Sequence, residues 1–301
     1  MSERIFRTLP AMLFGGLKRT RKKVRSGTSR LEVHALIRVD ELAARRDRVQ
    51  FGEVKRFCLF VGFPRSGHSL VGAMLDAHPD MVVAHEFGAL GFVQRGWTRS
   101  ALFGAIMKSD RKFAASGWKN TDRYEYEVLG QWQGRIRQLR VIGEKSGGDS
   151  SPLLNANPKL LDRLAELVGV PLGIVVVVRN PYDNIARIAR RDESTLLAAI
   201  VKYEVGAQAV EMALKVLSPH KVIVLYHEDT VTDPRATLRR LAAFFEVDSD
   251  AGWINDCAAL VLPQPRIARF DVDWSPAERL AADECIERHE FLARYEDSWA
   301  T

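Results

Sequence analysis

A strand, a glycine turn and a helix follow one another at residues 57–72, and this stretch constrains the chain most. The segment from Phe57 to Val61 is nearly all apolar, which is typical of a strand buried on both faces. Gly62 interrupts this run, and the apolar spacing from Leu70 onwards predicts a helix. Such a turn aims backbone N–H groups and the positive end of the helix at one point, where they stabilise an anion, most often phosphate. The sequence therefore predicts an anion-binding loop.

The glycines of this loop have the spacing of a nucleoside-triphosphate loop, but the residue types differ. Four residues separate Gly62 from Gly67, and His68 and Ser69 follow, where the motif G-x-x-x-x-G-K-[ST] has lysine and a hydroxyl residue. That lysine holds the outer phosphates of a triphosphate, so His68 in its place argues against an ordinary kinase or GTPase. Arg65, inside the loop, offers a planar guanidinium group that suits bidentate anion binding.

The loop also resembles a segment of a known enzyme family. Its sequence, Pro64-Arg65-Ser66-Gly67-His68-Ser69, is similar to the 5′-phosphosulfate loop P-[KR]-S-G-T-[TS] of sulfotransferases that use 3′-phosphoadenosine 5′-phosphosulfate (PAPS). The resemblance implies that residues 65–69 bind the 5′-phosphosulfate. His68 stands where the family has threonine, so the backbone donors survive while the contact made by this side chain is open. Taken alone, the stretch also fits a glycine turn in any α/β protein.

The charge of the chain is concentrated at its N-terminus. The 301 residues carry a net charge of +6, but residues 1–56 account for +9 and the remainder for −3. We therefore predict a basic extension at residues 1–55 and a sulfotransferase-like domain at residues 56–301. Apolar residues near the start, followed by the cationic cluster Lys18–Arg25, suit contact with an anionic membrane surface. A solvated tail, or a helix packed on the domain, is the favoured alternative because charge runs are usually solvated, and nucleic-acid binding is not expected because no aromatic residues are interleaved.

Cysteine usage and hydropathy indicate a cytoplasmic protein, and the basic extension suits peripheral contact with the inner face of the membrane. The three cysteines, Cys58, Cys257 and Cys285, are odd in number and lack metal-ligand spacing, which favours unpaired thiols in a reducing compartment. The longest apolar run, Val168–Val178, is shorter than the ~20 residues that span a membrane. The apolar stretch near the N-terminus is followed by lysines and arginines rather than a cleavage site, so a signal peptide is not expected.

Predicted strands alternate with predicted helices along the chain. This alternation indicates an α/β fold with a doubly wound parallel sheet, whose ligand lies at the carboxyl ends of the strands. The expected strands are 57–61, 81–84, 140–144, 173–178 and 221–226, and we expect the second to lie beside the first. Proline or cap signals predict helix starts at Asn157-Pro158, Asn180-Pro181, Asp233-Pro234 and Ser275-Pro276. The aromatic-rich segment 97–132 fits either an acceptor-binding lid or an insertion packed on the core.

The residues that follow the predicted strands are the candidates for chemistry. The second strand ends at His85-Glu86, the third at Glu144-Lys145 and the fourth at Arg179. Many nucleoside triphosphatases place a magnesium-binding aspartate after the strand that here ends in Arg179. We therefore expect guanidinium groups, and no metal, to neutralise the anion. Glu228 or Asp229 after the fifth strand is open as a magnesium ligand, with capping or ion pairing the favoured role.

Three further segments strengthen the resemblance to the sulfotransferases. Val178–Asp183 is similar to the family's 3′-phosphate segment, Tyr226–Leu241 to its Y-E-D-L-x-x-D-P helix entry, and Ile142–Ser146 to the G-[DE]-K-[ST] turn of its carbohydrate branch. The resemblance covers residues 57–295 in the family's order. It implies that Arg179 binds the 3′-phosphate of PAPS, and that PAP is the product. Arg187 occupies the position of the family's 3′-phosphate serine, so its role there is open.

The resemblance implies in-line transfer of a sulfuryl group from PAPS to an acceptor hydroxyl or amine, belonging to a glycan, a glycolipid or a small alcohol. The base in the family is a histidine or a glutamate after the second strand. Glu86 is preferred because the turn at Glu144-Lys145 resembles the carbohydrate branch, and His85 is the alternative. Lys145 is a candidate to stabilise charge on the bridging oxygen. The competing classes are a small-molecule kinase with a phosphate loop and a nucleotide-binding module without catalysis.

Overall fold

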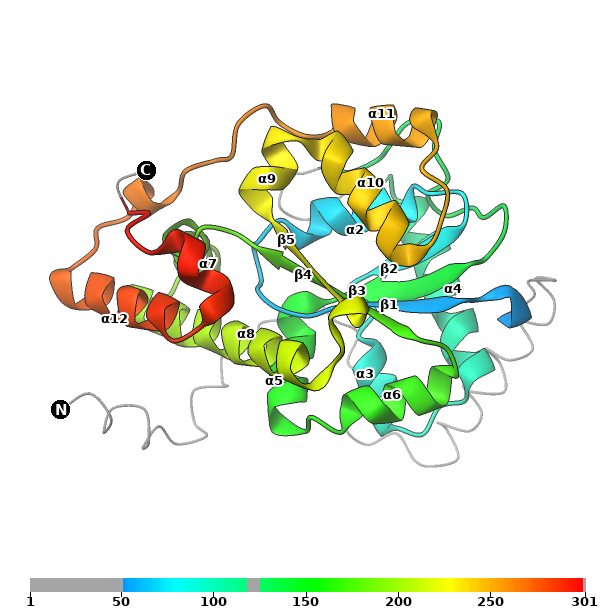
Figure 1. Ribbon diagram of the computed structural model, residues 1–301, viewed down its shortest axis with the longest axis horizontal. Coiled ribbons are helices and arrows are strands. Elements are labelled where there is room, and N and C mark those ends of the chain that lie inside the picture. Colours follow the sequence, from blue (N-terminus) through cyan, green and yellow to red (C-terminus); the bar gives the residue numbers. More distant parts are fainter. Residues whose placement is uncertain (1–50, 118–124, 300–301) are drawn as a thin grey trace. The chain divides into compact units, whose positions relative to one another are not determined.

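The computed structural model describes residues 51–117 and 125–299, which contain a five-stranded, all-parallel sheet (Figure 1). All five expected strands are present within a residue or two of their predicted bounds. Their apolar runs are buried on both faces, as parallel strands require. The strands are β1 (Arg56–Phe60), β2 (Met81–His85), β3 (Val141–Lys145), β4 (Leu172–Val178) and β5 (Val222–Tyr226).

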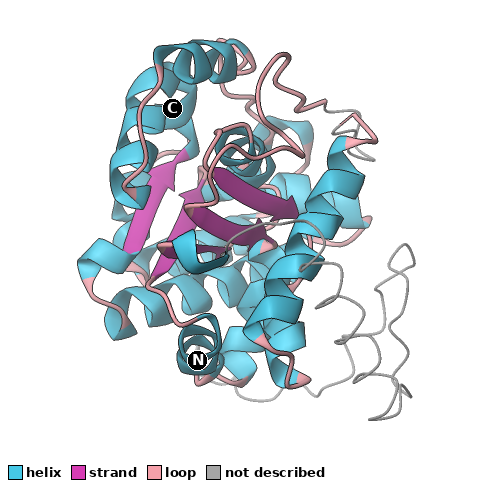
Figure 2. Ribbon diagram, turned by 90° about the vertical axis from the view of Figure 1, so that its right-hand side faces the viewer, coloured by secondary structure: helices cyan, strands magenta, loops and turns pink. Residues whose placement is uncertain are grey.

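Helices cover both faces of the sheet, which confirms the doubly wound α/β fold (Figure 2). Alternate residues of β1 point to opposite faces: Phe57 and Leu59 join one apolar cluster, whereas Cys58 and Phe60 join the other. The second cluster is completed by α2 (His68–Asp76) and α10 (Pro234–Phe245). The first is completed by α3 (Ala89–Gln94), α4 (Arg99–Ala114), α5 (Gly147–Ala156), α6 (Leu160–Val168), α7 (Pro181–Asp192), α8 (Leu196–Val216) and α12 (Pro276–Glu287).

The order of the strands, β2-β3-β1-β4-β5, corrects one expectation. β2 does not lie beside the loop strand β1, because β3 pairs with both and separates them. The chain between β2 and β3 is long enough to form α3 and α4 and then to place β3 between β2 and β1. Gly143 suits this central position, since a Cβ atom there would lie 1.9 Å from the carbonyl oxygen of Cys58. Neighbours in sequence are therefore not neighbours in the sheet here.

Three of the four predicted helix starts are confirmed by their caps. The side chain of Asn180 accepts hydrogen bonds from two backbone N–H groups of α7, Asp233 caps α10, and Ser275 forms a capping box with Glu278. The fourth is wrong in detail: Asn157 makes no side-chain cap, and α6 begins only at Leu160. Asn157 instead ends α5, a helix that its two initial glycines and internal proline conceal in the sequence.

The aromatic-rich segment packs on the core where the structure describes it. α4 lies against β2 and β3, and its Leu102, Phe103 and Ile106 are fully buried. The core-packing interpretation therefore holds for α4, while residues 118–124 lie outside the described part of the chain. The basic extension and its membrane contact also fall mostly outside it, so both stay predictions. Within residues 51–117 and 125–299, no helix combines the length and apolar character needed to cross a membrane.

Two buried carboxyl groups, Asp76 at the end of α2 and Asp110 on α4, lie close enough to influence each other's ionisation. Asp76 accepts a hydrogen bond from the backbone N–H of Val83 at 2.8 Å. Burial raises the pKa of Asp76 well above its usual value and that of Asp110 to about 6. The two groups titrate as a coupled pair that prefers to hold a proton.

This pair makes stability depend on pH in a defined direction. A carboxyl group whose pKa is higher in the folded than in the unfolded protein binds its proton more tightly in the folded state. Its protonation therefore stabilises the folded protein at low pH, and this contribution is lost as the pH rises through about 6. Between pH 5 and 7.5 the free energy of unfolding of the wild type should fall by about 1–3 kcal/mol more than that of Asp110→Asn. Urea unfolding at both pH values measures the difference. The exposed carboxylate variant Asp162→Asn is the control, and equal falls in all three proteins would contradict the prediction.

Candidate active site

The loop between β1 and α2 is held in place by two helices. Ser151 of α5 accepts a hydrogen bond from the N–H of Gly62 at 3.0 Å, and Asn184 of α7 donates to the carbonyl of Pro64 at 3.0 Å. Gly67 precedes the helix with a φ of 99°, a conformation that favours glycine. Because the first N–H groups of a helix have no partner within it, the start of α2 offers donors to an anion. The predicted strand, glycine turn and helix are therefore present, and anion binding by the loop stays a prediction.

Two side chains of the loop bond back to the loop itself. Ser66 donates from its hydroxyl to the carbonyl of Phe63 at 3.1 Å, and His68 donates from Nδ1 to the same oxygen at 2.8 Å. Burial, together with the charge of Lys145, lowers the pKa of His68 to about 3, so the ring is neutral. The histidine in the position of the usual lysine or threonine thus closes the loop internally. The ring is therefore engaged within the loop, and the backbone N–H of His68 stands at the start of α2.

Lys145, at the end of β3, connects the loop with the end of β2. Its Nζ lies 3.1 Å from Oγ of Ser69 and 3.4 Å from Oε1 of Glu86, and only 1% of its side chain is exposed. Its stem packs on Gly72, where an added Cβ atom would come within 3.0 Å of Lys145 Cγ. Burial lowers the pKa of Lys145, while the carboxylate of Glu86 opposes that shift. One ammonium group therefore touches both the loop and the predicted base.

The two candidates for the base differ in exposure. The side chain of Glu86 is 52% exposed, whereas that of His85 is 7% exposed. The His85 ring stacks on Phe113 with 4.3 Å between ring centroids, and burial lowers its pKa to about 3. Glu86 has a φ of 49°, which is uncommon outside glycine and costs roughly 1 kcal/mol or more. Of the two side chains, the carboxylate is therefore the one that an incoming molecule can reach.

Glu144, the first residue of the Glu144-Lys145 turn, has a structural role. Its two carboxylate oxygens accept hydrogen bonds from the backbone N–H groups of Gly88 at 3.1 Å and Ala89 at 3.2 Å. These N–H groups lie at the start of α3, where a carboxylate is favourable. Because Gly88 lies two residues after Glu86, this contact fixes the segment that carries the candidate base.

Cationic side chains gather on the other side of the loop. Arg179 follows β4, is 4% exposed and donates to the carbonyl of Arg266. His227 follows β5, and its ring lies against Gly67, since a Cβ atom there would come 2.6 Å from Nδ1. Burial, and next the charges of Arg179 and Arg187, lower the pKa of His227 to about 4. The structure therefore brings both predicted arginines near His227, beside the loop.

Two parts of this arrangement were not predicted as site residues from the sequence. The first is His227, although its position directly after an apolar strand is a usable signal. The second part is the segment around Ala268, whose N–H donates to Asp183 at 2.7 Å, as does that of Arg269 at 2.8 Å. No local sequence pattern predicts this contact, because it joins residues 85 positions apart.

The acidic residues after β5 are engaged in structural contacts. Glu228 accepts from the N–H of Asn180 at 2.9 Å and from the hydroxyl of Tyr295 at 2.5 Å. Asp229 forms a bidentate pair with Arg294 at 2.8 and 3.0 Å. The favoured interpretation of this pair as capping and ion-pairing residues is consistent with these contacts.

A parallel α/β sheet with a glycine turn between β1 and α2, and with Arg179 directly after β4, is a phosphate-loop-like arrangement. The chain belongs to the sulfotransferase family, since the model of that family matches residues 59–251, more than half of its length. It is thus a sulfotransferase with respect to family, fold and class of reaction.

Solved structures with a similar fold are themselves sulfotransferases. The sulfotransferase domain of the Synechococcus PCC 7002 olefin synthase is 18% identical, with a TM-score of 0.51, over 78% of this chain and 94% of that one. Sulfotransferase STF9 from Mycobacterium avium is 12% identical (TM-score 0.49, 86% and 82% covered). Mouse sulfotransferase SULT7A1, solved with PAP, is 16% identical (TM-score 0.46, 86% and 94% covered). At 18% identity, the similarity to the Synechococcus domain supports the fold alone. The search of curated protein sequences found no match.

Proposed function

We propose that the chain transfers a sulfuryl group from PAPS to an acceptor hydroxyl, with Glu86 as the base. The observation that carries this proposal is the position of Lys145, whose Nζ contacts Ser69 of the loop and Glu86 together. A group held by the loop would lie beside the ammonium, and an acceptor reaching that group would lie beside the carboxylate. Positioning and electrostatic stabilisation are what group transfer of this type requires.

The donor would be bound at both of its anionic ends. The N–H groups at the start of α2 and the guanidinium of Arg65 would hold the 5′-phosphosulfate, in the manner of other phosphate loops. Arg179 and Arg187, on the far side of Gly67, would hold the 3′-phosphate as charge-assisted donors. Arg187 in place of the family's serine then adds a charge to this subsite rather than removing a contact.

Two side chains would share the catalytic roles: one would accept the proton and the other would stabilise developing charge. Glu86 would accept the proton of the acceptor hydroxyl as its oxygen attacks sulfur, because its carboxylate is exposed while the His85 ring is covered by Phe113. Lys145 would stabilise the negative charge that develops on the bridging oxygen as the bond from sulfur to the 5′-phosphate breaks. This arrangement asks for no metal ion, and the acceptor class of glycan, glycolipid or small alcohol is set by groups around Glu86.

Replacing Arg179 by alanine tests the orientation of the donor. The variant should bind PAP roughly 10–100-fold more weakly, because a charge-assisted hydrogen bond contributes about 1.5–3 kcal/mol. Adenosine 5′-phosphosulfate, which lacks the 3′-phosphate, should bind with nearly unchanged affinity. Calorimetric titration of both nucleotides makes the measurement, with the exposed Arg163→Ala on α6 as the control. Equal losses for the two nucleotides would show that Arg179 does not contact the 3′-phosphate.

A further inference from the structure

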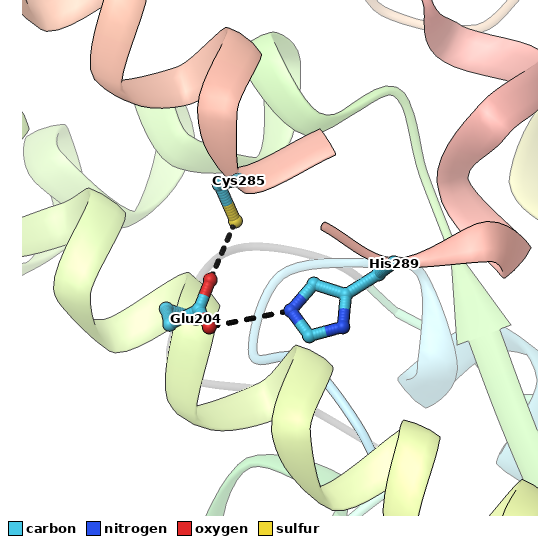
Figure 3. A group of neighbouring side chains, drawn as sticks. All are labelled: Glu204, Cys285 and His289. Atoms are coloured by element: carbon cyan, nitrogen blue, oxygen red, sulfur yellow. Dashed lines mark hydrogen bonds and ion pairs between the residues drawn. The ribbon is translucent and has the colours of Figure 1, made fainter. Parts of the chain in front are cut away.

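Three potential metal ligands meet in the interior between α8 and α12, outside the site described above (Figure 3). Glu204 comes from α8, Cys285 from the last turn of α12, and His289 from the residues just after it. They are 8%, 0% and 3% exposed. Cys285 Sγ lies 3.0 Å from Glu204 Oε2, and His289 Nε2 lies 3.3 Å from Glu204 Oε1. A thiol, an imidazole and a carboxylate thus point at one another.

The types and spacing of these ligands suit zinc. One atom from each residue can be chosen so that all three lie within 4.8 Å of one another. A single Zn²⁺ ion reaches such a set, because its bonds to sulfur, nitrogen and oxygen are about 2.0–2.3 Å long. A thiolate and an imidazole select zinc over the hard ions Mg²⁺ and Ca²⁺. Three protein ligands would leave one position of a tetrahedral site for water.

The surrounding side chains are arranged as the outer partners of a metal site are. His289 presents Nδ1 to a second carboxylate, Glu211 Oε2, at 3.0 Å. A hydrogen bond donated there leaves the lone pair of Nε2 directed towards Glu204 and Cys285. Arg288 donates to Oε2 of Glu204 at 3.1 Å and so fixes the carboxylate. Metal-ligating histidines and carboxylates are commonly held in these two ways.

We propose that Glu204, Cys285 and His289 bind a zinc ion that fastens α12 to α8. Binding would release the thiol proton to solvent and leave a zinc–thiolate bond, so that the two anionic ligands balance the ion. The competing account is a hydrogen-bonded cluster, in which Glu204 accepts from Cys285, Arg288, His289 and, at 3.1 Å, Gln208. Only metal binding distinguishes the two accounts.

The site lies directly behind the phosphate loop. Tyr203, the neighbour of Glu204, stacks on Phe63 of the loop with 4.3 Å between ring centroids. Gly206 also lies against the loop, since a Cβ atom there would come 2.7 Å from the Phe63 ring and 3.1 Å from the carbonyl of Gly62. The ion would therefore stabilise the helix on which the loop rests, without taking part in sulfuryl transfer. This inference stands independently of the identity of donor and base.

Cobalt titration of the full chain, stripped of metal, tests the proposal. Co²⁺ should bind with a stoichiometry of one and produce the charge-transfer absorption of a thiolate ligand, and Zn²⁺ should remove that absorption. At a 100-fold excess over its dissociation constant, Zn²⁺ should raise the melting temperature by roughly 5–10 °C. Cys285→Ser should lose the thiolate band. Cys257→Ser, which removes another buried thiol, should keep it.

A second variant keeps the test independent of the folding of Cys285→Ser. Glu211 is partly exposed, pairs with the exposed Lys215 through Oε1 and contacts His289 only at Nδ1, so Glu211→Gln should fold, keep the band and bind zinc roughly 10–100-fold more weakly. A wild-type protein without a thiolate band would overturn the proposal. So would a band that persists in Cys285→Ser, or zinc affinity unchanged in Glu211→Gln.

Discussion

Glu86→Gln is expected to lower kcat by about 10²–10⁴-fold while leaving PAP affinity nearly unchanged. Glutamine keeps the shape and the hydrogen bond to Lys145 but cannot accept a proton at neutral pH. The nucleotide contacts proposed above lie on the loop and the arginines, so ground-state binding of PAP should not respond. The measurement is turnover of PAPS to PAP with the best acceptor from a panel of alcohols and sugars, together with calorimetric titration of PAP.

His85→Asn is the matched comparison for this variant. The His85 ring is stacked under Phe113 and held neutral, so its loss should reduce kcat much less than the loss of the Glu86 carboxylate. An inactive His85→Asn beside an active Glu86→Gln would identify His85 as the base. Near-normal turnover in both variants would mean that neither residue takes the proton.

Lys145→Met should have the second large effect, a fall in kcat of about 10²–10³-fold. Methionine retains an unbranched apolar stem to pack on Gly72 but removes the ammonium that touches Ser69 and Glu86. The ammonium is worth most where charge develops during transfer, so kcat should fall further than PAP affinity. Turnover and PAP titration of the same preparation measure both quantities.

Two controls accompany Lys145→Met. Lys159→Met removes an exposed ammonium before α6 and should behave as the wild type. The melting temperature of each variant, with and without PAP, shows whether the nucleotide site is still folded. A Lys145→Met protein that keeps its PAP response and turns over within a few-fold of the wild type would remove Lys145 from the mechanism.

Local patterns predicted much of the fold, because each depends on a few neighbouring residues. The apolar runs ending at Val61 and Val178 are recognisable as buried parallel strands without any tertiary information. The glycine turn at Gly62 and Gly67 likewise predicts the loop and the helix after it. The helix starts at Asn180 and Ser275 were predicted correctly for the same reason, since a helix cap is a contact over two or three residues.

The remainder depends on contacts between distant segments. The insertion of β3 between β1 and β2 depends on pairing between distant strands, which no local periodicity encodes. Lys145 and Ser69, which are in contact, lie 76 positions apart in the sequence. The sequence therefore indicated each residue as functional but did not predict their contact. For His68, the residue type gave no indication that its ring bonds to the carbonyl of Phe63.

Binding of PAP tests the account most directly, since loop, arginines and family membership all lead to that nucleotide. The melting temperature of the full chain is measured with PAP, with ATP plus Mg²⁺ and with GTP plus Mg²⁺ at equal concentrations. PAP at about 100-fold its dissociation constant should raise the melting temperature by roughly 5–10 °C, whereas both triphosphates should change it little. A rise with ATP and Mg²⁺ but none with PAP would contradict the account and favour a kinase.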